Sequence, residues 1–348
     1  MREMNVAGVR IANDTDVFVI AEIGHNHQGD MEKCKQLFDA AKESGANAVK
    51  LQKRQNKTMF TKAMYNEVYN SENAYAETYG EHREFLEFDF DQYKELKEYA
   101  EEIGIVFFST AFDIPSADFL AKLDIPCFKM ASGDLTNLPL LKYVAEMGKP
   151  MFMSTGGGTM DDVRRAHDAV AAINSNFCIM QCTAGYPPEW EELNLAVIAT
   201  YRDAFPDTVI GFSSHDSGIA MALAAYPLGM RVVEKHFTLN RAWKGTDQAF
   251  SLEKPGLRRL VRDLRRVRIA MGDGVKRQYD SEKKPLYKMA KKLVFNRDLP
   301  QGHVLTSEDI ACKVPNDGIP PYRMDEFVGK TLTAPVIEDQ SVAEELVR

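Results

Sequence analysis

Eight short runs of apolar, β-branched and aromatic residues recur along residues 17–238, and each is followed by a stretch with helical spacing. The runs occupy residues 17–24, 48–52, 105–111, 127–132, 151–155, 177–183, 209–215 and 232–238. Helices are predicted between them, for example over 31–45, 90–104 and 160–173. Near-continuous apolar strands that alternate with helices predict a parallel sheet covered by helices. Eight such repeats in about 240 residues favour a (β/α)₈ TIM barrel over an open, doubly wound sheet.

The pattern changes after the eighth predicted helix. Residues 273–291 are charged and weakly periodic, and the remainder has short strand-like runs separated by glycine and proline turns. We therefore predict an α/β chain with a TIM-barrel catalytic domain over 1–280, a linker over 281–289 and a small β-rich domain over 290–348. A domain of that size is too small to stand firmly alone, so it is expected to pack on the barrel or on a partner subunit.

Charge and composition exclude several classes of protein. The chain of 348 residues carries a formal net charge of −8 with a pI near 5.5, whereas nucleic-acid binders usually present a basic face. The first apolar run is short and contains Glu22, and no stretch approaches the roughly 20 apolar residues of a membrane helix. The sequence therefore predicts a cytoplasmic protein without nucleic-acid or membrane partners, whose five cysteines are reduced.

Two histidines stand near the ends of consecutive predicted strands. His215 ends the run 209–215, and His236 lies in the run 232–238, 21 residues further along the chain. The carboxyl ends of neighbouring barrel strands meet at one rim, where catalytic groups collect. Two imidazoles at that rim can share a divalent metal. The alternative for either residue alone is a buried, hydrogen-bonded histidine without a ligand.

Charged residues inside the apolar runs indicate the charge of the substrate. Lys50 and Lys129 are costly to bury unless they meet an anion, so they predict an anionic substrate. The competing interpretation is a structural ion pair with Glu22 or Glu234. Glu234 points to the same side of its strand as His236, where it can bind the metal, orient a ligand or transfer a proton. Glu22 can orient a ligand or transfer a proton from across the barrel.

Hydroxyl groups and one long connection complete the predicted rim. Hydroxyl side chains that suit a phosphate lie at the strand ends at Thr110, Ser132, Ser154 and Ser213. A serine in such a place is often only a helix N-cap, which is the alternative interpretation.

Residues 53–89 form an unusually long connection rich in Tyr, Asn and Glu. A loop of that length at the catalytic rim usually acts as a lid or as a wall of the substrate site.

The motifs at these strand ends resemble those of the sialic acid (nonulosonate) synthase family, which includes relatives named from spore-coat polysaccharide synthesis. The matching segments are AEIGHNHQG (21–29), VKLQ (49–52), FFSTAFD (107–113), FKMASGD (128–134), STGG (154–157), QCTAGYP (181–187), GFSSHDSG (211–218) and EKHFT (234–238). The segments LPQGHVLTSEDI (299–310) and FVGKTL (327–332) resemble the antifreeze-like (SAF) domain of the same enzymes. The resemblance covers the whole chain.

The resemblance implies a reaction and a role for each rim residue. Such enzymes condense phosphoenolpyruvate with an N-acetylmannosamine- or mannose-type aldose, free or 6-phosphorylated, into a nine-carbon 2-keto acid and release phosphate. His215 and His236 are implied as ligands of a divalent metal, manganese first, with magnesium or cobalt as alternatives. The positions around phosphoenolpyruvate are Lys50, Thr110, Lys129, Ser132, Ser154 and Ser213. The positions around the aldose and the reacting centre are Gln52, Phe112, Tyr186, Asp247 and the catalytic carboxylates Glu22 and Glu234.

The resemblance also implies a domain-swapped homodimer, in which the SAF domain of one subunit caps the active site of its partner. Ala184 replaces an asparagine near the phosphate, and Val314 replaces an arginine that reaches the partner's N-acetyl group in the well-studied bacterial enzymes. The segments TYGEHREFLEF (78–88) and WKGTD (243–247) resemble the animal enzymes, which use 6-phosphorylated sugars. Lys244 follows the eighth predicted strand, where it can neutralise a sugar phosphate. We therefore expect a hexose 6-phosphate as the aldose.

Two other functions are compatible with the same residues. One is a different metal-dependent TIM-barrel enzyme, such as an aldolase or an epimerase, which releases no phosphate from phosphoenolpyruvate. The other is a non-catalytic carbohydrate-binding protein, in which the SAF domain is the working part and the barrel is inert. The intact histidines and lysines argue against the second function.

Overall fold

The computed structural model describes residues 2–348, which form two compact units that divide between Gly272 and Asp273. The first unit contains the barrel, and the second contains the small β-rich domain. The segment predicted as a linker, 281–289, lies in helix α12 (Asp280–Met289) of the second unit. Within residues 2–348, no helix has both the length and the apolar character needed to cross a membrane.

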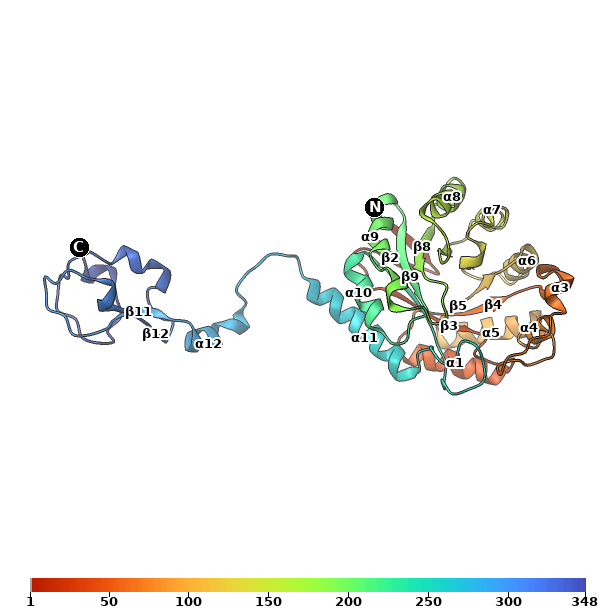
Figure 1. The fold of residues 1–348 in the computed structure, drawn as a ribbon, viewed down its shortest axis with the longest axis horizontal. Coiled ribbons are helices and arrows are strands. Elements are labelled where there is room, and N and C mark those ends of the chain that lie inside the picture. The colour runs from red at the N-terminus through yellow and green to blue at the C-terminus, as the bar shows by residue number, and fades with distance from the viewer. Residues whose placement is uncertain (1) are drawn as a thin grey trace. The chain divides into compact units, whose positions relative to one another are not determined.

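Eight parallel strands of the first unit close into a barrel, so the predicted TIM barrel is confirmed (Figure 1). In chain order they are β3 (Phe18–Gly24), β4 (Ala48–Lys53), β5 (Val106–Ala111), β6 (Phe128–Met130), β7 (Met151–Ser154), β8 (Phe177–Cys182), β9 (Val209–Ser214) and β10 (Val232–His236). Each strand pairs with the next along the chain, and β10 closes the barrel against β3 with His236 opposite Glu22. Every strand coincides closely with one predicted apolar run.

Helices surround the barrel, and each except the last returns the chain to the amino end of the next barrel strand (Figure 1). They are α1 (Met31–Glu43), α5 (Phe90–Ile103), α6 (Ile114–Lys122), α7 (Leu138–Glu146), α8 (Met160–Ala171), α9 (Val197–Ala204), α10 (Ala220–Leu228) and α11 (Lys254–Met271). The long connection between β4 and α5 adds α2 (Asn56–Met59), α3 (Lys62–Tyr65) and α4 (Tyr79–Phe85). Asp30 and Asp113 cap their helices by accepting from a backbone N–H three residues on, which fixes where each strand-to-helix loop ends.

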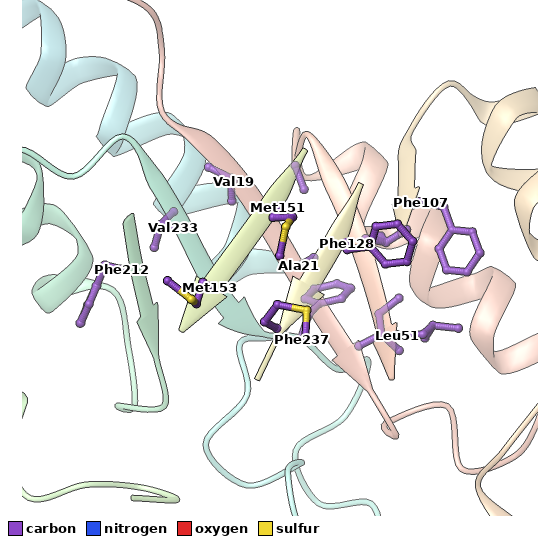
Figure 2. Close-up of a cluster of buried hydrophobic side chains, with 14 of the residues drawn as sticks. Val19, Ala21, Leu51, Phe107, Phe128, Met151, Met153, Phe212, Val233 and Phe237 are labelled. Atoms are coloured by element: carbon purple, nitrogen blue, oxygen red, sulfur yellow. The ribbon is translucent and has the colours of Figure 1, made fainter. Parts of the chain in front are cut away.

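Two apolar layers show how the strand residues alternate. The larger layer joins one face of the strands to the helices, and Figure 2 shows part of it, including Val19, Ala21 and Phe212. The smaller layer contains Phe18, which alternates with Val19 on β3. Phe18 stacks on Phe152 of β7 with the ring centroids 6.0 Å apart, although β3 and β7 are not neighbours. The smaller layer therefore fills the barrel interior.

The interior changes from apolar to polar along the strands. On β3, Ile20 belongs to the interior layer and Glu22 follows on the same face. On β10, Val232 belongs to that layer, and Glu234 and His236 follow on the same face. The period of two therefore carries the charged side chains to the carboxyl rim, while apolar side chains fill the other end of the barrel.

An N-terminal hairpin, which the apolar runs did not indicate, completes the interior layer. Strands β1 (Glu3–Val6) and β2 (Val9–Ala12) pair in antiparallel fashion. Met4, Val6 and Ile11 pack into the interior layer beside the first residues of the barrel strands. Each hairpin strand has only 4 residues, which is too short for a recognisable apolar run.

The second unit has a core of its own. Strand β11 (Lys292–Phe295) pairs in antiparallel fashion with β12 (Ile310–Lys313), and an isolated bridge joins Leu299 to Val336. Apolar side chains, Leu293 and Phe327 among them, form a cluster separate from both barrel layers. A small β-rich domain therefore follows the barrel, as predicted.

Candidate functional site

A cavity of about 570 Å³ opens at the carboxyl ends of the barrel strands. Its wall includes the predicted residues Glu22, Lys50, Gln52, Thr110, Phe112, Lys129, Ser132, Ser154, Tyr186, Ser213, His215, Glu234, His236 and Asp247. Lys244 is the predicted residue that the wall does not include: its ammonium lies over Tyr75, 4.9 Å from the ring centroid. The fold thus brings together every predicted site residue except Lys244.

Two lysines and two glutamates form a buried charge network in this cavity. Lys50 Nζ lies 2.8 Å from Glu22 Oε2 and donates to Thr110 Oγ1 at 2.8 Å. Glu234 Oε1 lies 3.7 Å from Lys50 Nζ and 3.8 Å from Lys129 Nζ. All four charged side chains are buried. The lysines therefore form the ion pairs of the competing interpretation, and they also line the cavity in which an anion would bind.

Burial and the neighbouring lysine charges give the two glutamates different pKa values. Burial raises the pKa of Glu22 to about 7, against the attraction of Lys50. Burial also acts on Glu234, but Lys129 and Lys50 outweigh it and lower the pKa of that carboxyl below its ordinary value. Ser213 Oγ donates to Glu234 Oε1 at 3.3 Å. A carboxyl pair divided in this way supplies one proton carrier and one anion near neutral pH.

Gln52 ties Glu22 to the neighbouring strand. Its Nε2 donates to Glu22 Oε1 at 2.7 Å, and its Oε1 accepts from Arg54 Nη2 at 2.7 Å. Gly24 permits this approach at the point where the pairing of β3 with β4 shifts register. Its φ is +54°, and a Cβ there would lie 3.1 Å from Gln52 Nε2 and 3.3 Å from Glu22 Oε1. A side chain at position 24 would therefore push the two groups apart.

The predicted hydroxyls contact the site and not the helix ends. Lys129 Nζ donates to Ser154 Oγ at 2.6 Å, and the N–H of Gly156 donates to Ser132 Oγ at 2.9 Å. The helices that follow these strands begin with other capping residues, and none of the four predicted hydroxyl residues caps a helix within residues 2–348. The N-cap alternative is therefore wrong for these positions.

The two histidines lie on neighbouring strands, with their ring centroids 5.3 Å apart. His215 Nδ1 donates to the carbonyl oxygen of Thr183 at 3.0 Å, and its Nε2 therefore carries the lone pair. His236 Nδ1 is buried without a hydrogen-bond partner among the described residues, and Asp247 Oδ2 lies 3.7 Å from it. Burial, followed by the neighbouring His236, lowers the pKa of His215 to about 3. Burial also lowers the pKa of His236.

Two neutral imidazoles are suited to a divalent cation, because neutral imidazole is the metal-binding form. The buried Nδ1 of His236 is a polar atom in need of a partner. Within residues 2–348, no group of three His, Cys, Asp or Glu side chains is arranged to hold a metal ion. A cation at the histidines would take its remaining ligands from water or substrate, as catalytic metals with open positions do.

Aromatic rings shape the mouth of the cavity. The ring of Tyr186 lies 4.0 Å from that of His215 between centroids, and its side chain is largely exposed. Partial loss of hydration against the cavity wall, followed by the nearby Cys182 and Asp247, raises the pKa of Tyr186, so the phenol stays protonated near neutral pH. Phe112 lies under the Arg54 guanidinium, 3.7 Å from ring centroid to Cζ. Ala184 also lines the cavity and offers only a methyl group.

The sequence-based prediction missed three cavity residues that the connection 53–89 contributes. Arg54 follows β4 directly, Asn73 lies in the middle of the connection 53–89, and Arg83 lies in α4. The length of this connection was the one signal that pointed to them. By contributing these residues, the connection forms part of the cavity wall, which is one of the two roles expected for it.

Hydrogen bonds attach this wall to the loop after β10. Tyr75 Oη donates to the Lys244 carbonyl oxygen at 2.7 Å, and the N–H of Gly245 donates to Asn73 Oδ1 at 2.9 Å. Arg241, which stands near Lys244 in the sequence, donates from Nε to the Ala249 carbonyl oxygen at 2.6 Å. In the structure, the backbone of this loop supports the wall.

Comparison with known proteins shows which protein families this chain resembles. Residues 37–276 match the NeuB family, and residues 292–348 match the SAF domain. The N-acetylneuraminate-9-phosphate synthase of Homo sapiens is 42% identical over 331 residues, which cover 95% of this chain and 92% of the human protein. The N,N'-diacetyllegionaminic acid synthase of Campylobacter jejuni is 37% identical over 330 residues, which cover 94% and 98% of the two chains. The crystal structure of N-acetylneuraminic acid synthetase from Leptospira borgpetersenii matches with a TM-score of 0.72 and 29% identity, covering 82% of this chain and 95% of that one.

Proposed function

The chain belongs to the NeuB family, and from that premise we propose that it condenses phosphoenolpyruvate with an aldose to give a 2-keto acid and inorganic phosphate. The family predicted from the strand-end motifs is confirmed, and the chain is an enzyme of the N-acetylneuraminate synthase-like type. One observation carries the proposed reaction: two lysines, two glutamates and two histidines converge on one cavity. The names of the relatives support a nonulosonic acid as the product.

Phosphoenolpyruvate suits the cations and hydroxyls at the strand ends. Its carboxylate and phosphate need positive charge, which Lys50 and Lys129 supply from buried positions. Charge-assisted hydrogen bonds are strengthened at such positions, because the surroundings screen charge less than water does. Ser154 beside Lys129 and Thr110 beside Lys50 add hydroxyl groups. We therefore assign phosphoenolpyruvate to this part of the cavity.

The first half of the reaction joins C3 of phosphoenolpyruvate to the aldehyde carbon of the open-chain aldose. His215 and His236 would hold a divalent cation such as Mn²⁺, which would supply Lewis-acid polarisation of the aldehyde oxygen. The attack leaves positive charge at C2 of phosphoenolpyruvate, which the Glu234 carboxylate stabilises from the cavity wall. Glu22, with its pKa raised to about 7, is suited to protonate the oxygen of the new alcohol.

Phosphate leaves in the second half of the reaction. Water adds to C2 and gives up a proton to a cavity carboxylate. The bond between C2 and the bridging oxygen then breaks, and its electron pair leaves with the phosphate. The hydroxyl from water gives its proton to the departing phosphate and becomes the keto oxygen. Phosphoenolpyruvate adds three carbons, so a six-carbon aldose gives a nine-carbon 2-keto acid.

A phosphate-release assay tests this function. The protein is incubated with phosphoenolpyruvate, Mn²⁺ and, in turn, N-acetylmannosamine, its 6-phosphate, mannose 6-phosphate and a diacetamido hexose. We expect phosphate release that depends on one of these aldoses, and ¹⁸O from the bridging position in the phosphate. Bridging label in the keto group would contradict the mechanism. An aldolase, an epimerase or a carbohydrate-binding protein would release no phosphate from phosphoenolpyruvate.

We further propose a homodimer in which the SAF domain of one subunit caps the active site of its partner, and we place the enzyme in the cytoplasm. The small size of the SAF domain supports the association, because such a domain gains stability from packing on a larger partner. Sedimentation at equilibrium should give the mass of two chains. A monomer with full turnover would contradict the proposed dimer.

A further inference from the structure

Arg54 and Arg83 bring two guanidinium groups to the cavity wall with few partners. Arg54 is only 8% exposed, and its Nη2 donates to the neutral amide of Gln52 at 2.7 Å. Arg83 is half-buried, and its Nη2 donates to Tyr79 Oη at 2.9 Å. Within residues 2–348, neither guanidinium has a carboxylate oxygen within 4 Å, although ion pairs are plentiful around them. Neither guanidinium therefore has a carboxylate in direct contact, although Glu87 and Asp247 act on Arg54 from further away.

His25 lies between the two arginines and cannot accept from both. Arg54 Nη1 lies 3.3 Å from His25 Nε2, and Arg83 Nη1 lies 3.2 Å from His25 Nδ1. Burial, followed by the two guanidinium charges, lowers the pKa of His25 well below its ordinary value, so the ring is neutral. A neutral imidazole has one lone pair and one N–H. At least one guanidinium N–H therefore has no acceptor at this contact.

Lys53, beside Arg54 in the sequence, is a purely structural cation and gives a direct contrast. Its Nζ lies 2.8 Å from Glu87 Oε2, so its charge is neutralised within the protein. Arg54 instead has the ring face of Phe112 at 3.7 Å, which leaves the edge of the guanidinium for other contacts. Burial, followed by repulsion from Arg83, lowers the pKa of Arg54 to about 10, and it stays charged near neutral pH. Buried charge without a partner is costly, so an incoming anion accounts for its retention.

We propose that Arg54 and Arg83 bind the phosphate group of a phosphorylated aldose, so that the sugar substrate is a hexose 6-phosphate. This inference rests on the proposed condensation reaction. Planar guanidinium forks match the oxygens of a phosphate and bind them in pairs. Lys50 and Lys129 at the strand ends already serve phosphoenolpyruvate in that reaction. The two arginines come from the connection 53–89 and offer a second anion site on the same cavity.

The same arrangement gives Lys244 a supporting role. Its ammonium lies over Tyr75, and its carbonyl oxygen accepts from the hydroxyl of that tyrosine at 2.7 Å. Asn73, which lines the cavity, accepts from the N–H of Gly245 at 2.9 Å. The loop of Lys244 thus holds the wall on which the arginines stand, whereas the sequence alone suggested that Lys244 itself meets the phosphate.

The test is the preference for a phosphorylated aldose. For wild type and Arg83→Gln, kcat/KM is measured with N-acetylmannosamine 6-phosphate and with N-acetylmannosamine at saturating phosphoenolpyruvate. Arg54→Lys is the second variant, because it keeps the buried charge and removes the planar fork. We expect the ratio of the two kcat/KM values to fall about tenfold or more, as loss of a charge-assisted hydrogen bond implies. Binding of an unreactive hexitol 6-phosphate, measured by calorimetry, should weaken by a similar factor.

Two controls make the outcome decisive. Arg262→Gln removes an exposed arginine of α11 that pairs with Asp263, and it should leave the ratio unchanged. Lys244→Ala tests the competing site, and loss of the preference there but not in the arginine variants overturns the inference. A rise in KM for phosphoenolpyruvate with an unchanged ratio also overturns it, because the arginines would then bind phosphoenolpyruvate. If wild type releases no phosphate with any aldose, the proposed function fails, and hexitol 6-phosphate binding still decides whether the arginines form a sugar-phosphate site.

Discussion

Asp309 in the C-terminal unit and Glu234 in the barrel are both buried carboxylates, at 0% and 5% exposure, but their oxygens are used differently. Asp309 Oδ1 accepts from Arg297 Nη2 at 2.7 Å. Asp309 Oδ2 accepts from His303 Nε2 at 2.9 Å and from the N–H of Thr306 at 2.8 Å. Glu234 Oε1 has two lysine ammoniums at 3.7 and 3.8 Å, and its Oε2 has no hydrogen-bond partner among the described residues.

This difference separates a structural carboxylate from one that is available to a substrate. A fully partnered carboxylate fixes a local turn, as Asp309 does in the capping box that it forms with Thr306 at the short helix Ser307–Asp309. A buried polar atom without a partner costs stability, so its retention indicates a use beyond folding. His236 Nδ1 is a second such atom at the same cavity. Lys235, next to it on β10, is by contrast paired with Asp216 at 2.7 Å.

Removal of a cavity histidine should have the largest effect, because the histidines belong to the cavity whose buried polar atoms are available to a ligand. His215→Ala and His236→Ala are expected to lower kcat about a hundredfold or more, since Lewis-acid catalysis contributes several kcal/mol. The free energy of unfolding should change little, since rim side chains serve function more than stability. Turnover is measured by phosphate release, Mn²⁺ binding by calorimetry and stability by urea unfolding.

His167→Ala is the matched control for these histidines. His167 lies on α8, stacks on Phe205 with the ring centroids 4.3 Å apart and contacts Thr208 Oγ1 at 3.1 Å. Its removal should lower stability and leave Mn²⁺ affinity unchanged. If His215→Ala kept both full turnover and full Mn²⁺ affinity, the metal assignment would be wrong.

Lys129→Ala tests the cationic part of the cavity and should have the next largest effect. Loss of a charge-assisted contact to phosphoenolpyruvate should weaken its binding by about 1.5–3 kcal/mol. The measurement is KM for phosphoenolpyruvate, with the phosphate-release rate at saturation as a second readout. Lys149→Ala, at the amino end of β7 where Lys149 pairs with Asp124, is the control that should leave this KM unchanged. An equal change in both variants would contradict the assignment.

The strand-borne part of this site could be predicted because strand geometry fixes it. The apolar run 209–215 became β9, and the period of two placed Glu234 and His236 on one face of β10. Parallel strands in a closed barrel bring all their carboxyl ends to one rim. Lys50 could therefore be assigned to the same cavity as these residues without knowledge of a single side-chain contact.

The loop-borne part could not be predicted, because loop conformation depends on contacts that leave no periodic pattern. The wall that carries Arg54 and Arg83 is held by hydrogen bonds such as that from Tyr75 Oη to the Lys244 carbonyl oxygen. Nothing in the spacing of these residues indicates that bond. Lys244 was therefore expected in the cavity and lies over Tyr75 instead. The metal and the dimer stay predictions.

Gly24→Ala sharpens the comparison by disturbing a single contact of the site. A non-glycine residue in the left-handed region costs about 1–2 kcal/mol of stability. The added methyl would also meet the Gln52 amide, which donates to Glu22. We expect reduced stability and a severalfold higher KM for the aldose. Gly148→Ala, at φ +70° with nothing within 4 Å of its Cβ, should show the stability loss alone. An unchanged KM in Gly24→Ala would mean that this contact does not position the substrate.

Acid titration of Asp309, the fully partnered carboxylate, should produce the smallest effect. Burial by itself would raise the pKa of Asp309, but hydrogen bonds from His303, Thr306 and Arg297 outweigh it and hold this pKa well below its usual range. A carboxyl whose pKa is lowered in the folded state stabilises that state above its unfolded pKa of about 4, and the stabilisation is lost as the pH falls below that value. The C-terminal unit should therefore lose at most about 1.4 kcal/mol per pH unit from this group. Hydrogen exchange of residues 292–348 in the full chain, corrected for intrinsic rates, measures the loss between pH 6 and pH 3.

Asp309→Asn should remove most of this acid dependence and lower the protection at pH 6. Asp325→Asn, at an exposed carboxylate of the same unit, should change neither. The same acid dependence in Asp309→Asn as in wild type would show that the partners of Asp309 do not set the stability of this unit.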